Sequence, residues 1–168
     1  YKGHPYLVHA AKLLKEQGRS GFRVLIAGTG SFEEDVARAV VEMGVEDVVQ
    51  MLGFRADVAA RLNILDVQLN ASYGTEATSL ALLEGMSLGL PTIASDYGGN
   101  PWLVTDGENG LLFPSRDSQS MAKAMAHLMD RPEERREMGR QARERFQTSF
   151  TGQVFAKIIE NVYKGVLK

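Results

Sequence analysis

The sequence predicts an α/β protein: a three-layer, doubly wound parallel sheet of the Rossmann-like kind, followed by a helical C-terminal tail. Three observations predict this fold class. Short apolar runs alternate with amphipathic segments, glycine-containing turns follow several of the apolar runs, and the chain after residue 117 shows helical periodicity only. Strands that are separated by helices pair in parallel through right-handed crossovers, which places helices on both faces of the sheet.

Size and composition fit one ordinary domain. A chain of 168 residues buries about 70% of its unfolded surface, so it needs no covalent staple. The absence of cysteine removes disulfides and thiolate zinc sites and fits a reducing compartment. A net charge of −2 argues against a nucleic-acid or anionic-membrane surface. No apolar run approaches the roughly 20 residues that span a bilayer, and the expected location is cytoplasmic.

The first half of the chain is expected to supply three strands and three helices. The run Phe22–Gly28 is continuously apolar, which is typical of a strand buried on both faces. A Gly28-Thr29-Gly30 turn follows, but Glu33 takes the place of the third glycine of a dinucleotide-binding loop, so that motif is weak. The other expected elements are an amphipathic helix within residues 1–18, a helix at Phe32–Met43 with Phe32, Val36, Val40 and Met43 on one side, strands at Val48–Leu52 and Val67–Ala71, and a helix at Ala56–Leu62.

The second half is expected to add two strands and a run of helices. A helix begins near Ser79 and stops at Gly89, and Pro91 opens a short apolar strand. Further on, we expect a turn at residues 106–110, a strand at Leu111–Phe113, a helix capped by Asp117-Ser118, a charge-rich and solvated segment at Arg131–Gln147, and a last helix at Gln153–Leu167. The last helix has a wide apolar stripe, for which we consider two covers: another domain of the same protein, or a second copy of the chain.

The stretch from Ser72 to Gly99 contains the residues that carry chemistry. Glu76 lies in a polar, turn-forming run, and Glu84 follows after seven intervening residues on the expected helix. Gly98-Gly99 comes directly after the next strand. Because the carboxyl ends of parallel strands meet at one edge of a sheet, the loop, the helix N-terminus and the Gly-Gly turn should converge where open α/β sheets bind ligands.

Glu76, Glu84, Gly89-Leu90-Pro91 and Gly98-Gly99 together resemble, in order and spacing, the signature of a known enzyme family. This family is the retaining, nucleotide-sugar-dependent glycosyltransferases of the glycogen-synthase-like "group 1", which have the GT-B fold. Nearly the whole chain fits the C-terminal, donor-binding domain of such an enzyme. The resemblance implies that residues 1–168 are this domain, and that its first strand, with a phosphate-binding Arg, and an N-terminal acceptor domain precede it.

The resemblance also implies which residues contact the donor. Lys2 would approach the donor diphosphate, the loop with Gly30 would lie near the donor, and the turn with Phe54 and Arg55 would lie against the base. For Phe54, packing in the core is an equally good interpretation. Glu76 is the implied catalytic residue, with a positioning and electrostatic role at the hexose. The donor-binding set is Lys2, Gly30, Phe54, Arg55, Ala77, Thr78, Ser79, Leu80, Glu84, Gly98 and Gly99.

A nucleoside diphosphate sugar makes demands that these residue types can meet. An ionised carboxylate accepts from both hydroxyls of the ribose diol, a role that suits Glu84 on a rigid helix. The N-terminus of the helix near Ser79 offers free amides to the diphosphate, and the small side chains of Ala77 and Ser79 let a ligand approach. Eight helical steps span roughly 12 Å, more than the ~5 Å between the acids of a retaining glycosidase. The expected donor is a UDP-, GDP- or ADP-linked sugar, with neither cofactor nor metal.

One position departs from the resemblance. The family more often has Gly-Gly-x-Pro-Glu, whereas Trp102 stands here in place of the acid. An indole at this position would stack on a base or a sugar, or fill space.

Two other functions remain open at this stage. A nucleotide-sugar epimerase of similar fold would need a different acid/base set, and a non-catalytic nucleotide-sugar-binding module would have a dead site. The expected partners are a nucleotide-sugar donor and the protein's own acceptor domain, with no nucleic acid and no membrane segment in these residues. Contact with the inner face of the membrane would be made through the acceptor domain.

Overall fold

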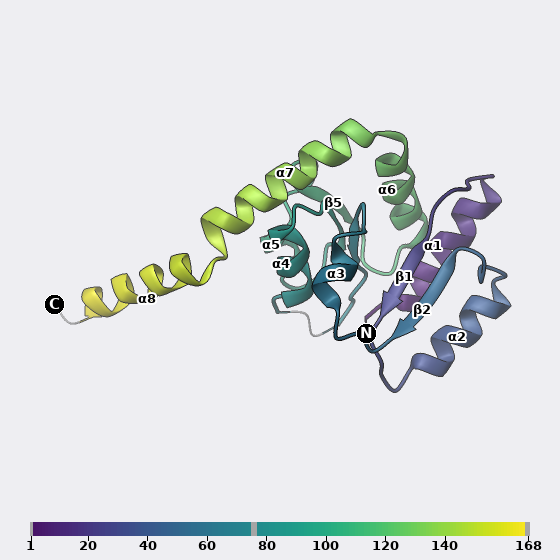
Figure 1. Cartoon of the computed structure of the whole chain (residues 1–168), viewed down its shortest axis with the longest axis horizontal. Helices are drawn as coiled ribbons and strands as arrows, with labels where there is room; N and C mark the ends of the chain where they lie inside the picture. The colour runs from purple at the N-terminus through teal and green to yellow at the C-terminus, as the bar shows by residue number, and fades with distance from the viewer. Residues whose placement is uncertain (1, 75–76, 167–168) are drawn as a thin grey trace.

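The computed structural model describes residues 2–74 and 77–166, and they form the predicted α/β alternation with a helical tail (Figure 1). The strands are β1 (Val24–Ala27), β2 (Val49–Gly53), β3 (Gln68–Asn70), β4 (Thr92–Ser95) and β5 (Gly110–Phe113). The helices are α1 (His4–Glu16), α2 (Glu33–Glu42), α3 (Val58–Leu62), α4 (Leu80–Ser87), α5 (Asn100–Leu103), α6 (Ser118–Asp130), α7 (Pro132–Ser149) and α8 (Gly152–Val166).

All strand pairs are parallel, as predicted, but they form two hydrogen-bonded sets instead of one sheet. One set is β1–β2, and the other has the order β3–β4–β5. Every residue of the central strand β4 is buried. Its sequence is free of charge, and its two hydroxyl side chains, Thr92 and Ser95, are hydrogen-bonded.

Each set has an open edge. Val24 donates its amide to the carbonyl of Val48 at 2.8 Å, so β1 faces β2, and Gln68 donates to the carbonyl of Pro91 at 3.0 Å, so β3 faces β4. Backbone donors alternate along a strand, so the amides of Leu25 and Leu69 point to the other edge. Within residues 2–74 and 77–166, no strand pairs with these edges of β1 and β3.

Helices cover both faces and complete three layers. On one face, α1, α2 and α6 pack around a core that contains Leu14, Ile26, Ile93, Phe113 and Met121. On the other face, α4, α5 and α7 enclose a smaller cluster of Leu82, Met86, Ala94, Leu103, Val104 and Ala142. The hydrophobic layers thus fix the helices that begin at the carboxyl edge of the sheet.

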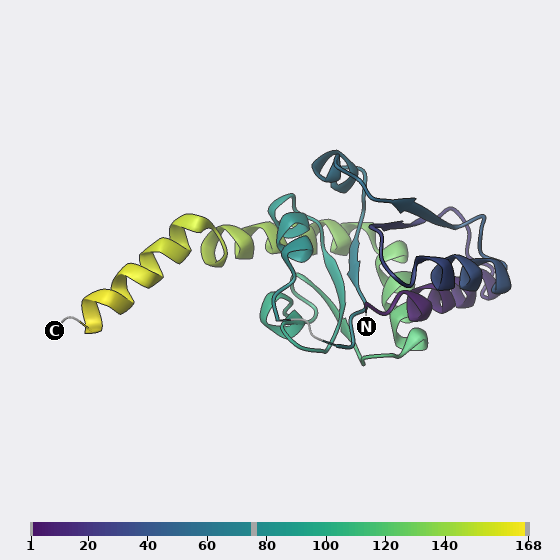
Figure 2. The same cartoon turned by 90° about the horizontal axis from the view of Figure 1, so that it is seen from below.

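The tail differs from the body in what it buries. Helix α7 packs Met138, Gly139 and Ala142 inward, while its charged face carries exposed pairs such as Arg140–Glu137, as predicted for a solvated face. Helix α8 then projects away from the rest of the molecule (Figure 1 and Figure 2). Its apolar side chains are exposed, among them Phe155, Ile158, Val162 and Val166. The two predicted covers for these side chains, another domain or a second copy of the chain, stay predictions.

One helix was not predicted, and one local expectation was wrong. The short helix α5 was not predicted, because it has a single turn with a proline at its start and little periodicity. Phe32 was expected on the buried side of its helix, but it stands at the N-cap, before the first helical residue, and 65% of its surface is exposed. Among the described residues, no helix combines the length and apolarity needed to cross a bilayer.

Candidate functional site

The carboxyl edge of the sheet brings together segments that are far apart in sequence. Gly3 packs against the end of β3: a Cβ at this position would lie 2.0 Å from the carbonyl oxygen of Ala71, and its φ is 77°. Only glycine satisfies both the close approach and the left-handed backbone. The exposed Lys2 is therefore held beside the loop that follows β3.

The electrostatic environment at the start of α1 disfavours a further positive charge. Burial lowers the pKa of His4, and the nearby charge of Lys2 lowers it further. A neutral imidazole is thus favoured at the first residue of α1, where the helix amides carry partial positive charge.

The loop after β4 lies directly against the segment that leads into α4. A Cβ on Gly99 would lie 1.6 Å from the carbonyl oxygen of Ala77. A hydrogen bond from the end of β4 also holds the segment after β3, because Ser95 donates its hydroxyl to the carbonyl of Ser72 at 2.5 Å. The side chain of Asn100, fully buried, donates to the carbonyl and hydroxyl oxygens of Ser95, both at 3.1 Å. The convergence predicted for the Gly-Gly loop and the helix start is confirmed.

Helix α4 has an open N-terminus. Ser79 is the N-cap, and its hydroxyl accepts from the amide of Leu82 at 3.4 Å. The amides before Leu82 have no acceptor within the helix, as in any helical first turn. Leu80 is 72% exposed although it is a leucine. The top of α4 is therefore an uncovered face rich in amide donors.

A buried amide fixes α4 on the sheet. Gln68 of β3 donates to the carbonyl of Leu82 at 3.0 Å and to the hydroxyl of Thr92 at 2.8 Å. Gly85 makes room for it, since a Cβ there would lie 2.0 Å from the Gln68 side-chain oxygen. The opposite face carries Glu84, exposed and one turn from Leu80. Glu84 is thus accessible on a rigid helix; its contact with ribose remains a prediction.

The side where a base is expected is open as well. Phe54 follows β2 and is 75% exposed, so the alternative that it packs in the core is wrong. Arg55 is half-buried, with its Nε 3.4 Å from a carboxylate oxygen of Asp57. Gly30 is exposed, and a Cβ on it would have no atom within 4 Å, so there is open space on that side of the loop.

Glu76, the predicted catalytic residue, lies outside the described residues, as does Thr75. Tyr73, which precedes them, is held between an aromatic ring and a cation. Its ring meets that of Tyr6 edge-on at 5.8 Å, and the guanidinium of Arg116 sits 4.6 Å from its centre. Arg116 has a φ of 65°. The residues around Arg116 do not indicate that it will contact Tyr73, because the contact arises only when the turn after β5 folds to the carboxyl edge.

Of the remaining predicted residues, Thr78 is exposed between Ala77 and the Ser79 cap, and Gly98 has a φ of 60°. The predicted donor-binding residues that the structure describes thus lie in the loops after β1, β2, β3 and β4, beside Gly3, and on α4, which carries Leu80 and Glu84. In the part of the chain that the structure describes, no group of three or more His, Cys, Asp and Glu side chains is arranged to hold a metal ion.

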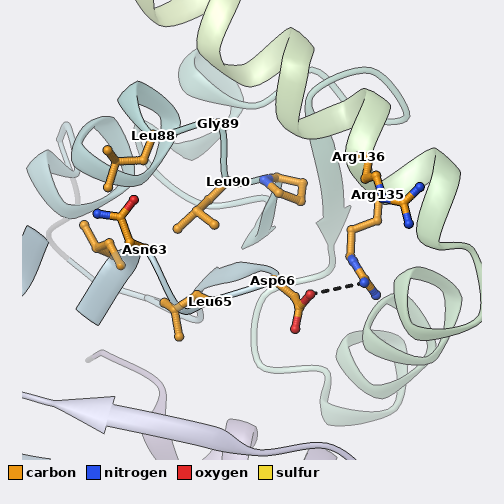
Figure 3. Close-up of a pocket in the computed structure, with 10 residues that line it drawn as sticks. Asn63, Leu65, Asp66, Leu88, Gly89, Leu90, Arg135 and Arg136 are labelled. Atoms are coloured by element: carbon orange, nitrogen blue, oxygen red, sulfur yellow. Dashed lines mark hydrogen bonds and ion pairs between the residues drawn. The ribbon is translucent and has the colours of Figure 1, made fainter. Parts of the chain in front are cut away.

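A hollow of 270 Å³ lies at the opposite end of the sheet, where the strands begin (Figure 3). It is bordered by Asp66 and Leu90, which precede β3 and β4, and by Arg135 of α7. Figure 3 shows the Arg135 guanidinium directed at Asp66, 3.1 Å away, and it also donates to the carbonyl of Leu128. Because ligands of open α/β sheets bind at the carboxyl end, we assign this hollow a structural role, in which α7 is fastened to the sheet.

A family model described as "Glycosyl transferases group 1" matches residues 1–145. The chain belongs to this family. Among curated relatives of this group 1 chain, the D-inositol 3-phosphate glycosyltransferase of Corynebacterium efficiens is 33% identical over 149 residues, which cover 84% of the chain and 35% of the relative. The amylovoran biosynthesis glycosyltransferase AmsK of Erwinia amylovora is 31% identical over 134 residues, 76% of the chain and 33% of the relative.

Solved structures share the fold. The structure of Anabaena Alr3699/HepE in complex with UDP superposes with a TM-score of 0.87 at 24% identity, covering 98% of this chain and 46% of that one. The group 1 chain spans less than half the length of the curated relatives it matches.

Proposed function

We propose that this chain is the donor-binding half of a retaining glycosyltransferase that moves a hexose from a nucleoside diphosphate sugar to an acceptor. The observation that carries the proposal is the arrangement at the carboxyl edge. The contact between Gly99 and Ala77, the open N-terminus of α4 and the exposed Glu84 one turn further along that helix lie within one short segment, which we call the rim. Relatives named as glycosyltransferases, and the UDP in the Anabaena structure, support it.

The charges of the donor match the rim. The first-turn amides of α4 and the cation of Lys2 face the same edge and suit two phosphate groups. Glu84, one helical turn beyond Leu80, accepts from the two ribose hydroxyls. The exposed Phe54 gives the base a flat apolar partner at the end of β2. Binding of the diphosphate is thus assigned to helix amides and side-chain cations, without a metal ion.

Chemistry at the sugar is assigned to Glu76. In the sequence it directly precedes Ala77, whose carbonyl lies against Gly99. We assign it a positioning and electrostatic role at the hexose, where charge develops as the diphosphate departs. We assign acceptor binding to the proposed N-terminal domain, so we expect residues 1–168 alone to bind the donor without transferring its sugar.

The open edges of β1 and β3 support the proposed domain boundary. A parallel strand that precedes Lys2, ends at the carboxyl edge and continues into α1 would run beside these edges and unite the two sets. The crossover from that strand through α1 to β1 is the usual right-handed unit. We propose this strand as the first of the domain and the source of the phosphate-binding Arg.

Titration calorimetry with UDP, GDP and ADP tests the ribose contact. We expect Glu84→Ala to weaken nucleotide binding by about 2–3 kcal/mol, near the upper end of the range for a hydrogen bond to a charged group. Glu46→Ala is the matched control, since Glu46 is exposed just before β2, at the opposite edge, and its loss should leave the affinity unchanged. Equal affinity of the Glu84 variant and the wild-type chain for all three nucleotides would remove the assignment.

A second titration separates the two acids. Glu76→Ala should leave the affinity for bare UDP unchanged and reduce the preference for UDP-glucose over UDP, because the proposed contact is to the hexose. Loss of bare-nucleotide binding in this variant would show that the roles of Glu76 and Glu84 are wrongly divided.

A further inference from the structure

The backbone of Arg116 has a conformation that glycine adopts far more readily than arginine. Its φ is 65°, and among the described residues no other residue except glycine has a φ in the left-handed region. There the Cβ of any other residue comes too close to a carbonyl oxygen, so such residues persist only where their surroundings hold them. Arg116 lies in the turn between β5 and the N-cap of α6, and an N-cap needs no arginine before it. The reason for an arginine here therefore lies in what its side chain contacts.

The guanidinium of Arg116 lies over the ring of Tyr73, 4.6 Å from the ring centre. Arg116 is exposed, and within residues 2–74 and 77–166 no carboxylate or carbonyl accepts a hydrogen bond from it. The neighbouring acid, Asp117, is occupied as the cap of α6, because its carboxylate accepts from the amides of Gln119 and Ser120. The attraction between the cation and the aromatic ring is thus the contact that this arginine makes.

A second aromatic ring also holds Tyr73. Tyr6 meets it edge-on, with the ring centres 5.8 Å apart and the ring planes at 88°. Tyr6 belongs to the first turn of α1, where its amide donates to the carbonyl of Gly3 at 3.0 Å, and Gly3 packs against Ala71 after β3. These contacts join the turn after β5, the segment after β3 and the start of α1 at the carboxyl edge, where the proposed function places the donor.

Tyr73 belongs to the loop between β3 and α4. The far end of this loop is fixed, since a Cβ on Gly99 would lie 1.6 Å from the carbonyl oxygen of Ala77. In the sequence, the same loop contains Glu76, which the proposed function assigns to the hexose. The groups assigned to the nucleotide, the first-turn amides of α4 and Glu84, belong to the helix that follows. A change in the hold on Tyr73 should therefore act on the sugar part of the donor and spare the nucleotide part.

We propose that Arg116 is a positioning residue for the donor hexose: its guanidinium holds Tyr73, and Tyr73 fixes the loop between β3 and α4 in the arrangement that receives the sugar. This inference rests on the proposed function. Arg116 itself touches neither the sugar nor the phosphates. Strained backbone conformations cluster at functional sites, which agrees with a role in binding for a residue that the fold alone does not require.

Titration calorimetry tests the proposal with three pairs of ligands: UDP and UDP-glucose, GDP and GDP-mannose, and ADP and ADP-glucose. The sugar ratio is the affinity for the sugar donor divided by the affinity for the bare nucleotide, in the pair that the wild-type chain binds. Arg116→Gln removes the cation and should lower the sugar ratio about two- to fivefold, the strength of an exposed cation–π contact. The affinity for the bare nucleotide should stay unchanged.

Two further variants serve as references for this measurement. Arg116→Lys keeps a cation over the ring and should retain most of the sugar ratio. Arg136→Gln is the matched control, because Arg136 is exposed, pairs with Glu133 on the same helix and borders the hollow at the opposite end of the sheet. Its loss should leave the sugar ratio unchanged.

Arg116→Gly distinguishes positioning from a general effect on stability. Glycine removes the cation together with the backbone strain, whereas glutamine removes the cation and keeps the strain. In thermal unfolding, the Gly variant should therefore melt above the Gln variant, while both have the same lowered sugar ratio. A sugar ratio that recovers in the Gly variant along with its stability would show that Arg116 serves the stability of the fold alone, and would overturn the inference.

The path through the loop is tested in a Glu76→Ala background. There, Arg116→Gln should not lower the sugar ratio further, because the contact that it positions is already lost. A further decrease would show that Arg116 contacts the sugar itself, and weaker binding of the bare nucleotide by Arg116→Gln would place it at the diphosphate; either result would overturn the inference.

Failure of the inference can be told apart from failure of the proposed function. A sugar ratio that falls in Glu76→Ala and stays unchanged in Arg116→Gln would overturn the inference alone. Absence of nucleotide binding, or an unchanged sugar ratio in Glu76→Ala, would overturn the proposed function, and the inference with it.

Discussion

Replacing Gly99 with alanine should damage the rim, because there is no room for a methyl group at this position. The backbone of Gly99 has an ordinary φ of −82°, so alanine is not strained by its own conformation. Its Cβ, however, would lie 1.6 Å from the carbonyl oxygen of Ala77 and 2.6 Å from the carbonyl carbon. Neither neighbour is a flexible side chain, so a backbone segment must move.

The size of the displacement follows from the contact distance. An ordinary contact begins at 3.4 Å, so the loop and the segment before α4 must separate by about 1.8 Å. Ser95 and Asn100 resist this movement through their hydrogen bonds to Ser72 and to each other. Overpacking of this kind costs about 1–3 kcal/mol, which lowers the melting temperature of a chain of this length by about 3–9 °C. Misplacement of a binding group by about 1 Å can cost a hundredfold in function.

Thermal unfolding and UDP calorimetry on the same samples measure both effects. We expect Gly99→Ala to melt lower and to bind UDP at least tenfold more weakly, a change of about 1.4 kcal/mol. Gly152→Ala is the matched control, because Gly152 has no atom within 4 Å of its Cβ position and begins α8 far from the rim. A Gly99 variant that melts and binds like the wild-type chain would refute the idea that this contact shapes the site.

Three further predictions concern the support of the rim and the tail. Ser79→Ala should lower the free energy of unfolding by about 1 kcal/mol through loss of the N-cap, while Ser79→Asp should retain it, as measured by urea denaturation. Gln68→Ala should cost about 2 kcal/mol, because the carbonyl of Leu82 and the hydroxyl of Thr92 lose their donor inside the protein; a variant as stable as the wild-type chain would contradict this. Hydrogen bonds from Arg140 and Gln141 lower the pKa of Glu137 to about 2 from 4.5. The stability from this carboxylate is therefore present above pH 4.5 and lost as the pH falls towards 2, so Glu137→Gln should reduce stability at pH 6 more than at pH 2.

Local patterns predicted the parts of the site that depend on short stretches of chain. The helix start near Ser79, the helix that carries Glu84 and its end at Gly89 depend on residues within one or two turns, and the structure has all three. Glu84 is exposed because it lies on the face of this helix opposite to the buried Leu82 and Met86. Asp117 caps α6 as predicted, because an N-cap needs only the next three residues.

Contacts between residues that are far apart in the sequence could not be predicted from local patterns. Nothing near Gly99 indicates that Ala77 will lie against it, and the periodicity that placed Phe32 inside did not reveal where α2 would begin. Phe54 looked like a core residue because it is aromatic, yet the end of β2 leaves it in solvent. Arg116 reaches Tyr73 only because the turns after β3 and β5 emerge side by side.

The amino-acid order alone determined the class of fold, the sequence of strands and helices, and the family signature that links Glu76, Glu84 and Gly98-Gly99. Those features follow from periodicity, capping and turn chemistry, which act between residues a few positions apart. Folding in three dimensions decided that Gly3, Ala77 and Gly99 meet at one rim, that the strands form two sets with open edges, and that Trp102 stands in solvent. These depend on which backbones approach within contact distance, and that is settled only when helices and strands from the whole chain pack together.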